Sequence, residues 1–189
     1  MKVNLYDFDK TIYDGDSSKD FFFFCLKKYP KILKIIPKIV VSAIKYKLKI
    51  ISKTAMKETI FSFLKYVKDV DKEVNLFWES KKVRIKKFYM ETNHDKDIII
   101  SASPEFLLHP MCDELNVLDL IGSKVDKKTG SFSGENCHGE EKVRRLNELY
   151  KDISVMNAYS DSLSDIPILK LANKSYIVKK NKLILKNFK

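Results

Sequence analysis

The chain begins with a short apolar run that suits a strand buried within a sheet. Its apolar residues are Val3, Leu5 and Tyr6, and two carboxylates one residue apart, Asp7 and Asp9, come next. In open α/β sheets the ligand crevice lies at the carboxyl ends of the strands, so both carboxylates are expected there. A plainer interpretation of the same turn is that Asp9 or Thr11 caps a following helix.

Apolar positions recur at helical spacing between residues 14 and 94. The spacing predicts four helical regions, one closed by Pro30 and three over residues 32–44, 55–67 and 70–90. Pro37 is expected to bend or divide the second of them. Aromatic side chains at such spacings more often form a bundle core than a binding surface. Residues 14–94 are therefore predicted to form an α-helical cap inserted after the first strand.

Beyond residue 94, short β-branched runs alternate with helical stretches. The pattern predicts helices over 107–115 and 139–150, a hairpin with a Gly turn over 124–132, and strands over 98–100, 117–122, 153–158 and 176–178. Strands alternating with helices imply a parallel, doubly wound sheet. The expected fold is α/β, with a Rossmann-like doubly wound core formed by residues 1–13 and 95–189.

The composition is that of a folded protein with a substantial core. At 189 residues, of which 44% are hydrophobic, the chain can bury the core of one domain with a sizeable insertion. Cys25, Cys112 and Cys137 are scattered without a C-x-x-C pair, which favours reduced thiols in a cytoplasmic protein. Cys137 and His138 are neighbours without further Cys or His partners, so a zinc site is not expected.

Neither a signal peptide nor a transmembrane segment is expected. Residues 1–11 have the pattern of a strand and a turn, without an uninterrupted apolar core. The most apolar stretch, residues 32–51, is interrupted by lysines, whereas a bilayer-spanning helix needs about 20 apolar residues. The sequence thus predicts a cytoplasmic location.

The net charge of +11 is concentrated in the predicted cap, where residues 21–57 hold ten lysines and no acidic residue. Such a segment attracts anionic substrates, membrane surfaces or nucleic acid, but a solvated lysine-rich face is the simpler interpretation. Only three of the 36 basic residues are arginine, the usual choice for bidentate phosphate recognition, which makes nucleic acid an unlikely partner. Peripheral membrane contact through the basic cap remains an alternative.

Further polar residues follow the later predicted strands. Ser101 follows the strand at 98–100, Lys142 begins a helix, and Asp161 and Asp165 follow the strand at 153–158. In a parallel sheet these ends converge with Asp7 and Asp9 on one edge. So many carboxylates together require a cation, and an all-oxygen environment favours Mg²⁺, which in turn favours phosphate-bearing substrates.

The motifs resemble, in order and spacing, the four sequence motifs of the haloacid dehalogenase superfamily. They are Asp7-Phe8-Asp9-Lys10-Thr11, Ser101 after its strand, Lys142, and Asp161 with Asp165. The helical insertion is similar to the small helical cap of the phosphoserine-phosphatase-like branch, subfamily IB. The resemblance covers essentially the whole chain, and it assigns no role to Lys10.

The resemblance implies a catalytic role for each motif. Asp7 would be the nucleophile that forms an aspartyl-phosphate, and Asp9 the general acid and then the general base. Lys142 would neutralise charge on the phosphoryl oxygens, and Ser101 would donate a hydrogen bond to one of them.

The resemblance also implies a metal site. The Mg²⁺ ligands would be Asp7, the backbone carbonyl of Asp9, and Asp161. Asp165 would not bind the metal directly but would reach it through water or orient Lys142.

The expected function is that of a Mg²⁺-dependent phosphatase acting on a small phosphorylated metabolite. Asp9 favours this reaction, because dehalogenases of the superfamily lack an acid at that position. One alternative is a phospholipid-precursor phosphatase of the phosphatidylglycerophosphate type at a membrane surface. Another is a non-catalytic binder of a phospho-ligand or nucleic acid.

Overall fold

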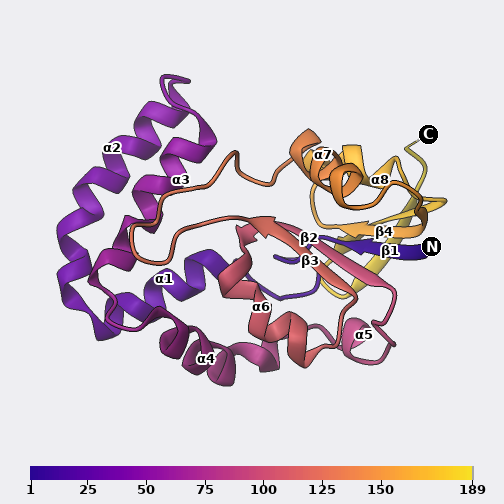
Figure 1. Cartoon of the computed structure of the whole chain (residues 1–189), viewed down its shortest axis with the longest axis horizontal. Coiled ribbons are helices and arrows are strands. Elements are labelled where there is room, and N and C mark those ends of the chain that lie inside the picture. Colours follow the sequence, from indigo (N-terminus) through magenta and orange to yellow (C-terminus); the bar gives the residue numbers. More distant parts are fainter. Residues whose placement is uncertain (189) are drawn as a thin grey trace.

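A central β-sheet organises the structure, a computed structural model that describes residues 1–188 (Figure 1). The six strands lie in the order β3-β2-β1-β4-β5-β6. Their bounds are β1 Lys2–Tyr6, β2 Asp97–Pro104, β3 Asp119–Ser123, β4 Ser154–Ser160, β5 Lys174–Lys179 and β6 Lys182–Lys186. The first five strands pair in parallel, and β6 pairs antiparallel with β5. The predicted doubly wound α/β sheet is confirmed, and its strand order reverses between β1 and β4, where such sheets bind ligands.

Helices cover both faces of this sheet. The α-helices of the described residues are α1 (Ser17–Lys28), α2 (Ile36–Lys47), α3 (Lys53–Phe61), α4 (Val70–Lys81), α5 (Lys87–Met90), α6 (Glu105–Glu114), α7 (Glu140–Leu149) and α8 (Ile166–Leu169). Leu5 and Ile98 point to the side where α7 and α8 pack, and Tyr6 and Ile99 point to the other side, towards α6. Because successive strand residues face opposite sides, the paired segments 5–6 and 98–100 are apolar at every position, as expected for strands buried on both faces.

The residues between β1 and β2 form helices α1 to α5, together with short 3₁₀ turns. Pro37 lies in the first turn of α2, after a 3₁₀ turn over Pro30–Ile35, so the predicted division at this proline is confirmed. Phe21 of α1 and Phe77 of α4 belong to the same buried cluster as Tyr6 of β1. The inserted segment therefore shares a continuous apolar core with the sheet, and its treatment as a separate domain stays a prediction.

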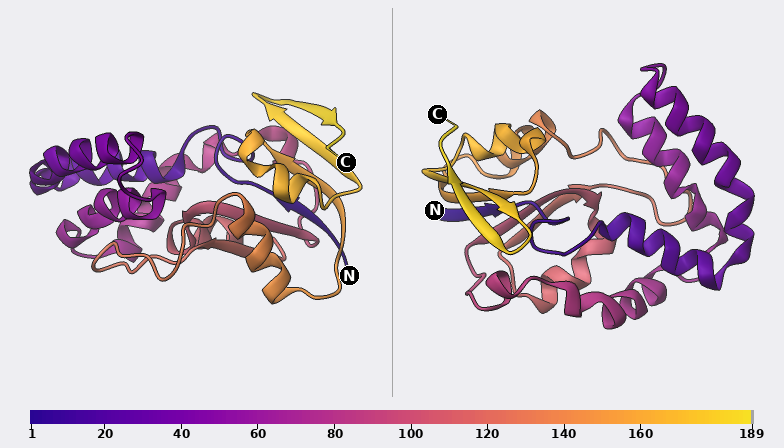
Figure 2. Two further views of the ribbon diagram at one scale, coloured as in Figure 1. Left: turned by 90° about the horizontal axis from the view of Figure 1, so that it is seen from above. Right: turned by 180° about the vertical axis from the view of Figure 1, so that it is seen from behind.

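Helices α2 and α3 form an antiparallel hairpin that projects beyond the rest of the molecule (Figures 1 and 2). Two hydrogen bonds attach α3 to the loop between β3 and α7. The backbone N–H of Phe132 donates to Glu58 (2.8 Å), and that of Asn136 donates to the Thr54 hydroxyl (3.1 Å). Helix α3 is thus tied to this loop both in its first turn and in its middle.

One local prediction is wrong. The predicted helix over 70–90 ends at Lys81, and after a 3₁₀ turn Ile85 is extended and pairs with Tyr13. Around that pair, Lys86 N–H donates to the carbonyl of Ile12 (2.8 Å), so backbone bonds to the turn after β1 replace helical ones.

The predicted hairpin over 124–132 is confirmed in a short form, with one antiparallel bridge between Val125 and Phe132 and a hydrogen bond from Asp126 N–H to the Ser131 carbonyl (2.9 Å). In the turn itself, the Asp126 side chain accepts hydrogen bonds from the backbone N–H groups of Lys128 and Thr129. Gly130 has a positive φ of 79°, and a Cβ there would lie 2.3 Å from the carbonyl oxygen of Phe61. The loop is therefore shaped by close contact with the inserted helices.

Residues 1–188 include no helix that is both long and apolar enough to cross a bilayer.

Helix α7 is anchored to the sheet by a buried ion pair. Glu141 accepts from Arg145 Nε (2.7 Å), and Arg145 also donates to the carbonyls of Gly122 and Glu135. Hydrogen bonds from Arg144, together with the charges of both arginines, lower the pKa of Glu141 to about 2. This carboxylate stabilises the fold at pH values above its unfolded pKa, and the stabilisation is lost as the pH falls towards 2.

We expect Glu141→Gln to lower the free energy of unfolding by about 2 kcal/mol at neutral pH, because Arg145 loses its buried partner. The difference from wild type should shrink as the pH falls from about 4.5 towards 2, as measured by urea unfolding. Glu148→Gln is the control, since Glu148 is 59% exposed and pairs with Arg144 at the surface. An equal loss for both variants, or a difference that does not change with pH, would contradict the argument.

Candidate active site

A cavity of about 180 Å³ lies at the carboxyl ends of the central strands. It is lined by Asp7, Asp9, Lys10, Asp16, Ser101, Ala102, His138, Lys142, Asp161, Ser162, Ser164 and Asp165. All six residues selected from the sequence are among them. They come from the turns after β1 and β4, the end of β2, and the first turn of α7.

The centre of the cavity wall is the ammonium group of Lys142, which is 1% exposed. Its Nζ donates to Asp7 Oδ1 (2.7 Å) and to Asp165 Oδ2 (2.9 Å). Burial opposes the charged form of Lys142, but the two carboxylates outweigh it and raise the pKa of the ammonium. Lys142 therefore stays protonated and fixes one oxygen of each carboxylate.

Asp7 and Asp161 are connected through Thr11. The hydroxyl of Thr11 donates to Asp7 Oδ2 (3.3 Å) and accepts from the backbone N–H of Asp161 (2.9 Å). The turn after β1 is thereby tied to the turn after β4, and both oxygens of Asp7 have partners. Thr11 is thus part of the first motif for a structural reason, instead of capping a helix.

Asp9 is held by the start of α1 and the end of β2. The backbone N–H of Ser17 donates to Asp9 Oδ1 (2.7 Å), and the Ser103 hydroxyl donates to Oδ2 (2.6 Å). Ser17 and Ser18 place their hydroxyls 3.1 and 2.9 Å from that of Ser103. Sequence reasoning missed Ser103, although its position two residues after Ser101 is a usable signal.

Asp165 is buried and accepts from the Ser160 hydroxyl (2.8 Å) as well as from Lys142. Its other oxygen, Oδ1, has no hydrogen-bond partner among the described residues. Ser101 is 1% exposed, and its hydroxyl accepts from the N–H of Ser103 (3.1 Å). That bond leaves the Ser101 hydroxyl proton available for another acceptor.

The inserted helices add positive charge that the sequence pattern did not reveal. Lys57 of α3 donates from Nζ to the carbonyl of Ala102 (2.7 Å), which belongs to the cavity wall. Burial, together with repulsion from Lys53, lowers the pKa of Lys57 to about 8. Burial and the same lysine also lower the pKa of His138. From sequence these lysines are indistinguishable from those of a solvated helical face.

Lys10 lines the cavity from a left-handed backbone conformation, with φ of 60°. Its carbonyl accepts a hydrogen bond from the buried ammonium of Lys86, which follows the 3₁₀ turn after α4. This contact and the Tyr13–Ile85 bridge hold the turn after β1 in place.

Three carboxyl groups of the site share one electrostatic property. Burial raises the pKa values of Asp7, Asp9 and Asp161 above their ordinary range. For Asp7, attraction by Lys142 opposes this effect, whereas Asp165 adds to it. Five carboxyl groups line the cavity beside the single buried ammonium of Lys142, so a cation bound there would offset the burial and favour their charged forms.

The donor atoms around this charge are suited to Mg²⁺. Residues 1–188 contain no group of three His, Cys, Asp or Glu side chains arranged to hold a metal. The carboxylates of Asp7 and Asp161 would therefore need a backbone oxygen to complete a protein ligand set. Mg²⁺ binds through one or two carboxylates while keeping several waters, and it prefers oxygen donors throughout, so this set fits.

One protein-family model matches most of this chain. The model of the family described as haloacid dehalogenase-like hydrolase matches residues 5–170, a range that includes all six predicted site residues. A histidinol-phosphatase from Neisseria meningitidis serogroup C is 28% identical over 96 residues, which are 44% of this chain and 43% of that protein. The match thus spans less than half the length of that relative.

Solved structures share the fold at low identity. A protein of unknown function from Bordetella pertussis Tohama I has a TM-score of 0.77 and 17% identity, covering 93% of this chain and 89% of that one. A phosphoserine phosphohydrolase-like protein from Francisella tularensis has a TM-score of 0.59 and 19% identity, with coverage of 96% and 88%. Both structural alignments cover more than nine-tenths of this chain and therefore include the sheet and most of the inserted helices.

We expect Ser103→Ala to raise the pKa of Asp9, because the hydrogen bond from Ser103 stabilises the ionised carboxylate. Titration of the Asp9 side-chain carboxyl carbon by NMR measures the change. Ser164→Ala is the control, because Ser164 lines the same cavity but bonds to Ser162 and to no described carboxylate. An unchanged pKa of Asp9 in Ser103→Ala would show that this bond does not hold the carboxylate in solution.

Proposed function

Because this chain belongs to the haloacid dehalogenase-like hydrolase family, we propose that it is a phosphatase that hydrolyses a phosphomonoester through an aspartyl-phosphate on Asp7. One observation carries the proposal: Asp7 and a second, separately held carboxyl group, Asp9, line the same cavity as the buried ammonium of Lys142. A nucleophile, a proton donor and a charge clamp are the groups that this reaction needs.

In the first step, a carboxylate oxygen of Asp7 attacks phosphorus, and the bond from phosphorus to the ester oxygen breaks. Asp9 gives its proton to the leaving alkoxide. Burial suits Asp9 to this role, because a raised pKa keeps the proton available, and the bonds from Ser17 and Ser103 fix its direction. Lys142 and the Ser101 hydroxyl stabilise the charge on the phosphoryl oxygens.

In the second step, water attacks the phosphorus of the aspartyl-phosphate. Asp9, now ionised, takes a proton from that water, and inorganic phosphate leaves while the Asp7 carboxylate is restored. Asp165 keeps Lys142 in place in both steps, since it holds the ammonium independently of Asp7. We assign it to positioning instead of direct contact with substrate.

Mg²⁺ is the proposed cofactor, with Asp7, the backbone carbonyl of Asp9, and Asp161 as its protein ligands. When bound, it would neutralise phosphoryl charge and orient the phosphate for attack. The all-oxygen donors and the excess of buried carboxylate support this assignment.

The proposed substrate is a small phosphorylated metabolite. The cavity of about 180 Å³ is small, and the inserted helices lie beside it through Lys57. A cytoplasmic location is part of the proposal and is supported by Cys25, Cys112 and Cys137, which are all buried as free thiols.

A phospholipid-precursor phosphatase is the second candidate. It is favoured by one feature, the apolar residues that α2 exposes to solvent, such as Val40 and Ile44. A non-catalytic binder is disfavoured, because the two hydrogen bonds that orient Asp9 serve no purpose in binding a phosphate anion.

We expect Asp7→Asn to reduce the turnover of a generic aryl phosphate by roughly a thousandfold or more, because the amide is a poor nucleophile. Release of inorganic phosphate in the presence of Mg²⁺ is the measurement. Asp95→Asn, at an exposed loop position, should retain wild-type turnover. Wild-type turnover by folded Asp7→Asn would exclude the proposed nucleophile.

We expect Asp161→Asn to weaken Mg²⁺ binding by at least about tenfold, as measured by calorimetric titration without substrate. Asp165→Asn should affect turnover more than Mg²⁺ affinity, because its oxygens contact Lys142 and Ser160. Chelation should abolish phosphate release, and added Mg²⁺ should restore it. Equal Mg²⁺ affinities of wild type and Asp161→Asn would remove Asp161 from the ligand set.

A further inference from the structure

Helix α2 carries apolar residues both on the side that packs on the core and on a side exposed to solvent. Ile36 and Ile39 pack on the main core, together with Ile35 just before the helix. Val40, Val41 and Ile44 of α2, with Leu48 and Ile50 of the turn that follows, are 50% to 65% exposed. We call these five residues the exposed hairpin face.

The helical members of this face form a stripe. Positions 40, 41 and 44 repeat at the spacing of one helix surface, and position 48 continues it by one turn. A soluble helix that packs on one side normally carries polar residues on the other, and contiguous exposed apolar surface marks an interaction site. This second apolar stripe has no partner among the described residues.

An open groove adjoins the face between α2 and α3. Its volume is about 500 Å³, and Pro37, Val41, Ile51 and Ala55 contribute apolar side chains to it, with Lys38 and Lys45 at the same groove. Val41 belongs to both the groove and the exposed hairpin face, so the two form a continuous apolar surface.

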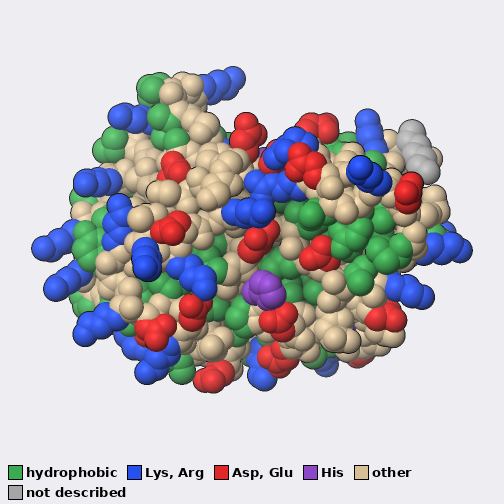
Figure 3. All heavy atoms as spheres, viewed as in Figure 1, with side chains coloured by type: hydrophobic (Ala, Val, Ile, Leu, Met, Phe, Trp, Pro, Cys, Tyr) green, Lys and Arg blue, Asp and Glu red, His purple; other side chains and the backbone are tan. Residues whose placement is uncertain are grey.

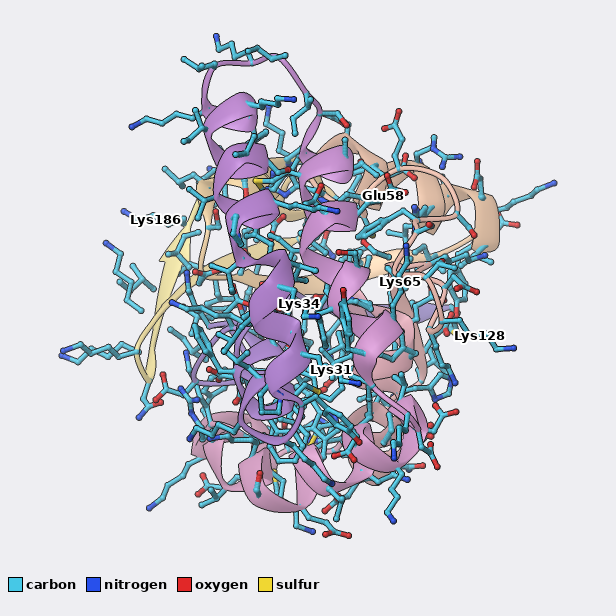
Figure 4. All side chains as sticks on the ribbon, turned by 90° about the vertical axis from the view of Figure 1, so that its left-hand side faces the viewer. Lys31, Lys34, Glu58, Lys65, Lys128 and Lys186 are labelled. Atoms are coloured by element: carbon cyan, nitrogen blue, oxygen red, sulfur yellow. The ribbon has the colours of Figure 1, made fainter. Side chains whose placement is uncertain are left out.

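Lysines surround this apolar surface. Lys34, Lys38, Lys45, Lys47 and Lys49 are all exposed, and none of them forms an ion pair with a described residue. No acidic residue occurs between positions 21 and 57. Figure 4 views the hairpin from the side away from the sheet, with Lys31 and Lys34 near the start of α2. Figure 3 shows basic side chains extending from this end of the molecule.

We propose that the α2–α3 hairpin docks on the surface of an anionic lipid bilayer, with the exposed hairpin face inserted at the boundary between headgroups and acyl chains. Apolar residues within a ring of lysines are the composition of helices that lie in such an interface. The lysine stems can lie along the apolar surface while their ammonium groups contact lipid phosphates.

Two other occupants fit this surface less well. A second copy of the chain would bring two rings of unpaired lysines together, and their repulsion opposes association. Nucleic acid would pair with the lysines but would leave the apolar stripe against a polar backbone. A bilayer satisfies both the charge and the apolar residues. Docking does not depend on the proposed phosphatase activity, and the test below does not measure it.

The test is co-sedimentation of the full chain with vesicles of phosphatidylglycerol and phosphatidylcholine, compared with vesicles of phosphatidylcholine alone. Wild type should bind the anionic vesicles at least about tenfold more strongly, and rising salt should weaken the binding. Absence of binding to the anionic vesicles at low ionic strength would overturn the proposal.

Matched variants separate insertion from general charge attraction. Val40→Ser with Ile44→Ser should reduce binding by at least about fivefold, because the inserted apolar area is lost. The control is Val83→Ser with Leu149→Ser, two residues that are 84% and 62% exposed elsewhere on the surface and should leave binding unchanged. If the variant with Val40→Ser and Ile44→Ser binds the vesicles as wild type does, binding is due to charge alone, and the proposed insertion is contradicted.

A second pair of variants tests the lysines. Lys45→Gln with Lys49→Gln should lower affinity by about fivefold for each lysine removed. Lys128→Gln with Lys186→Gln removes the same charge from other exposed sites (Figure 4) and should have a much smaller effect. Equal effects of the two pairs would contradict docking through the hairpin. A stable dimer that Val40→Ser with Ile44→Ser dissociates, seen by sedimentation equilibrium, would assign the face to a second copy instead.

Discussion

The structure depends on the charge balance around Lys142. This ammonium is buried at the switch point of the sheet, where it contacts Asp7 and Asp165 from positions 135 and 23 residues away along the chain. A buried ammonium without such partners would be strongly unfavourable, and the two carboxylates would repel each other without it. The turns after β1 and β4 and the start of α7 must therefore come together as one unit. Glu141 and Arg145 hold α7 in the orientation that this arrangement requires.

The inserted segment contacts the cavity wall through hydrogen bonds from three of its residues. Ser17 at the start of α1 holds Asp9, Lys57 of α3 holds the carbonyl of Ala102, and Lys86 holds the turn after β1. The apolar cluster beneath them is shared with the sheet, as Phe21 shows. The cavity is consequently lined from both parts of the chain, since Asp16 of the inserted segment belongs to its wall.

The basic character of the insertion has two separate physical consequences. Lys57 points inward, where burial lowers its pKa and its charge reaches the carboxylates of the site. The lysines of α2 point outward, unpaired, around an apolar stripe that includes Val40 and Ile44. One excess of positive charge thus contributes to the electrostatics of the cavity and also defines the outer surface of the hairpin.

The sequence by itself determined that a parallel α/β sheet forms, that helices lie between its first two strands, and that six polar residues meet at one edge, because strand periodicity, helical spacing and the order of polar residues after strands are local patterns. Only the tertiary structure decided that Ile85, predicted to be helical, is extended and pairs with Tyr13, since this pairing joins segments that are distant in the sequence. The same holds for Ser103, whose role depends on where β2 ends relative to Asp9. The surroundings of the lysines in residues 21–57 were also decided only by the tertiary structure. Periodicity assigns a residue to a helix face, but packing decides whether that face meets a cavity, the core or solvent.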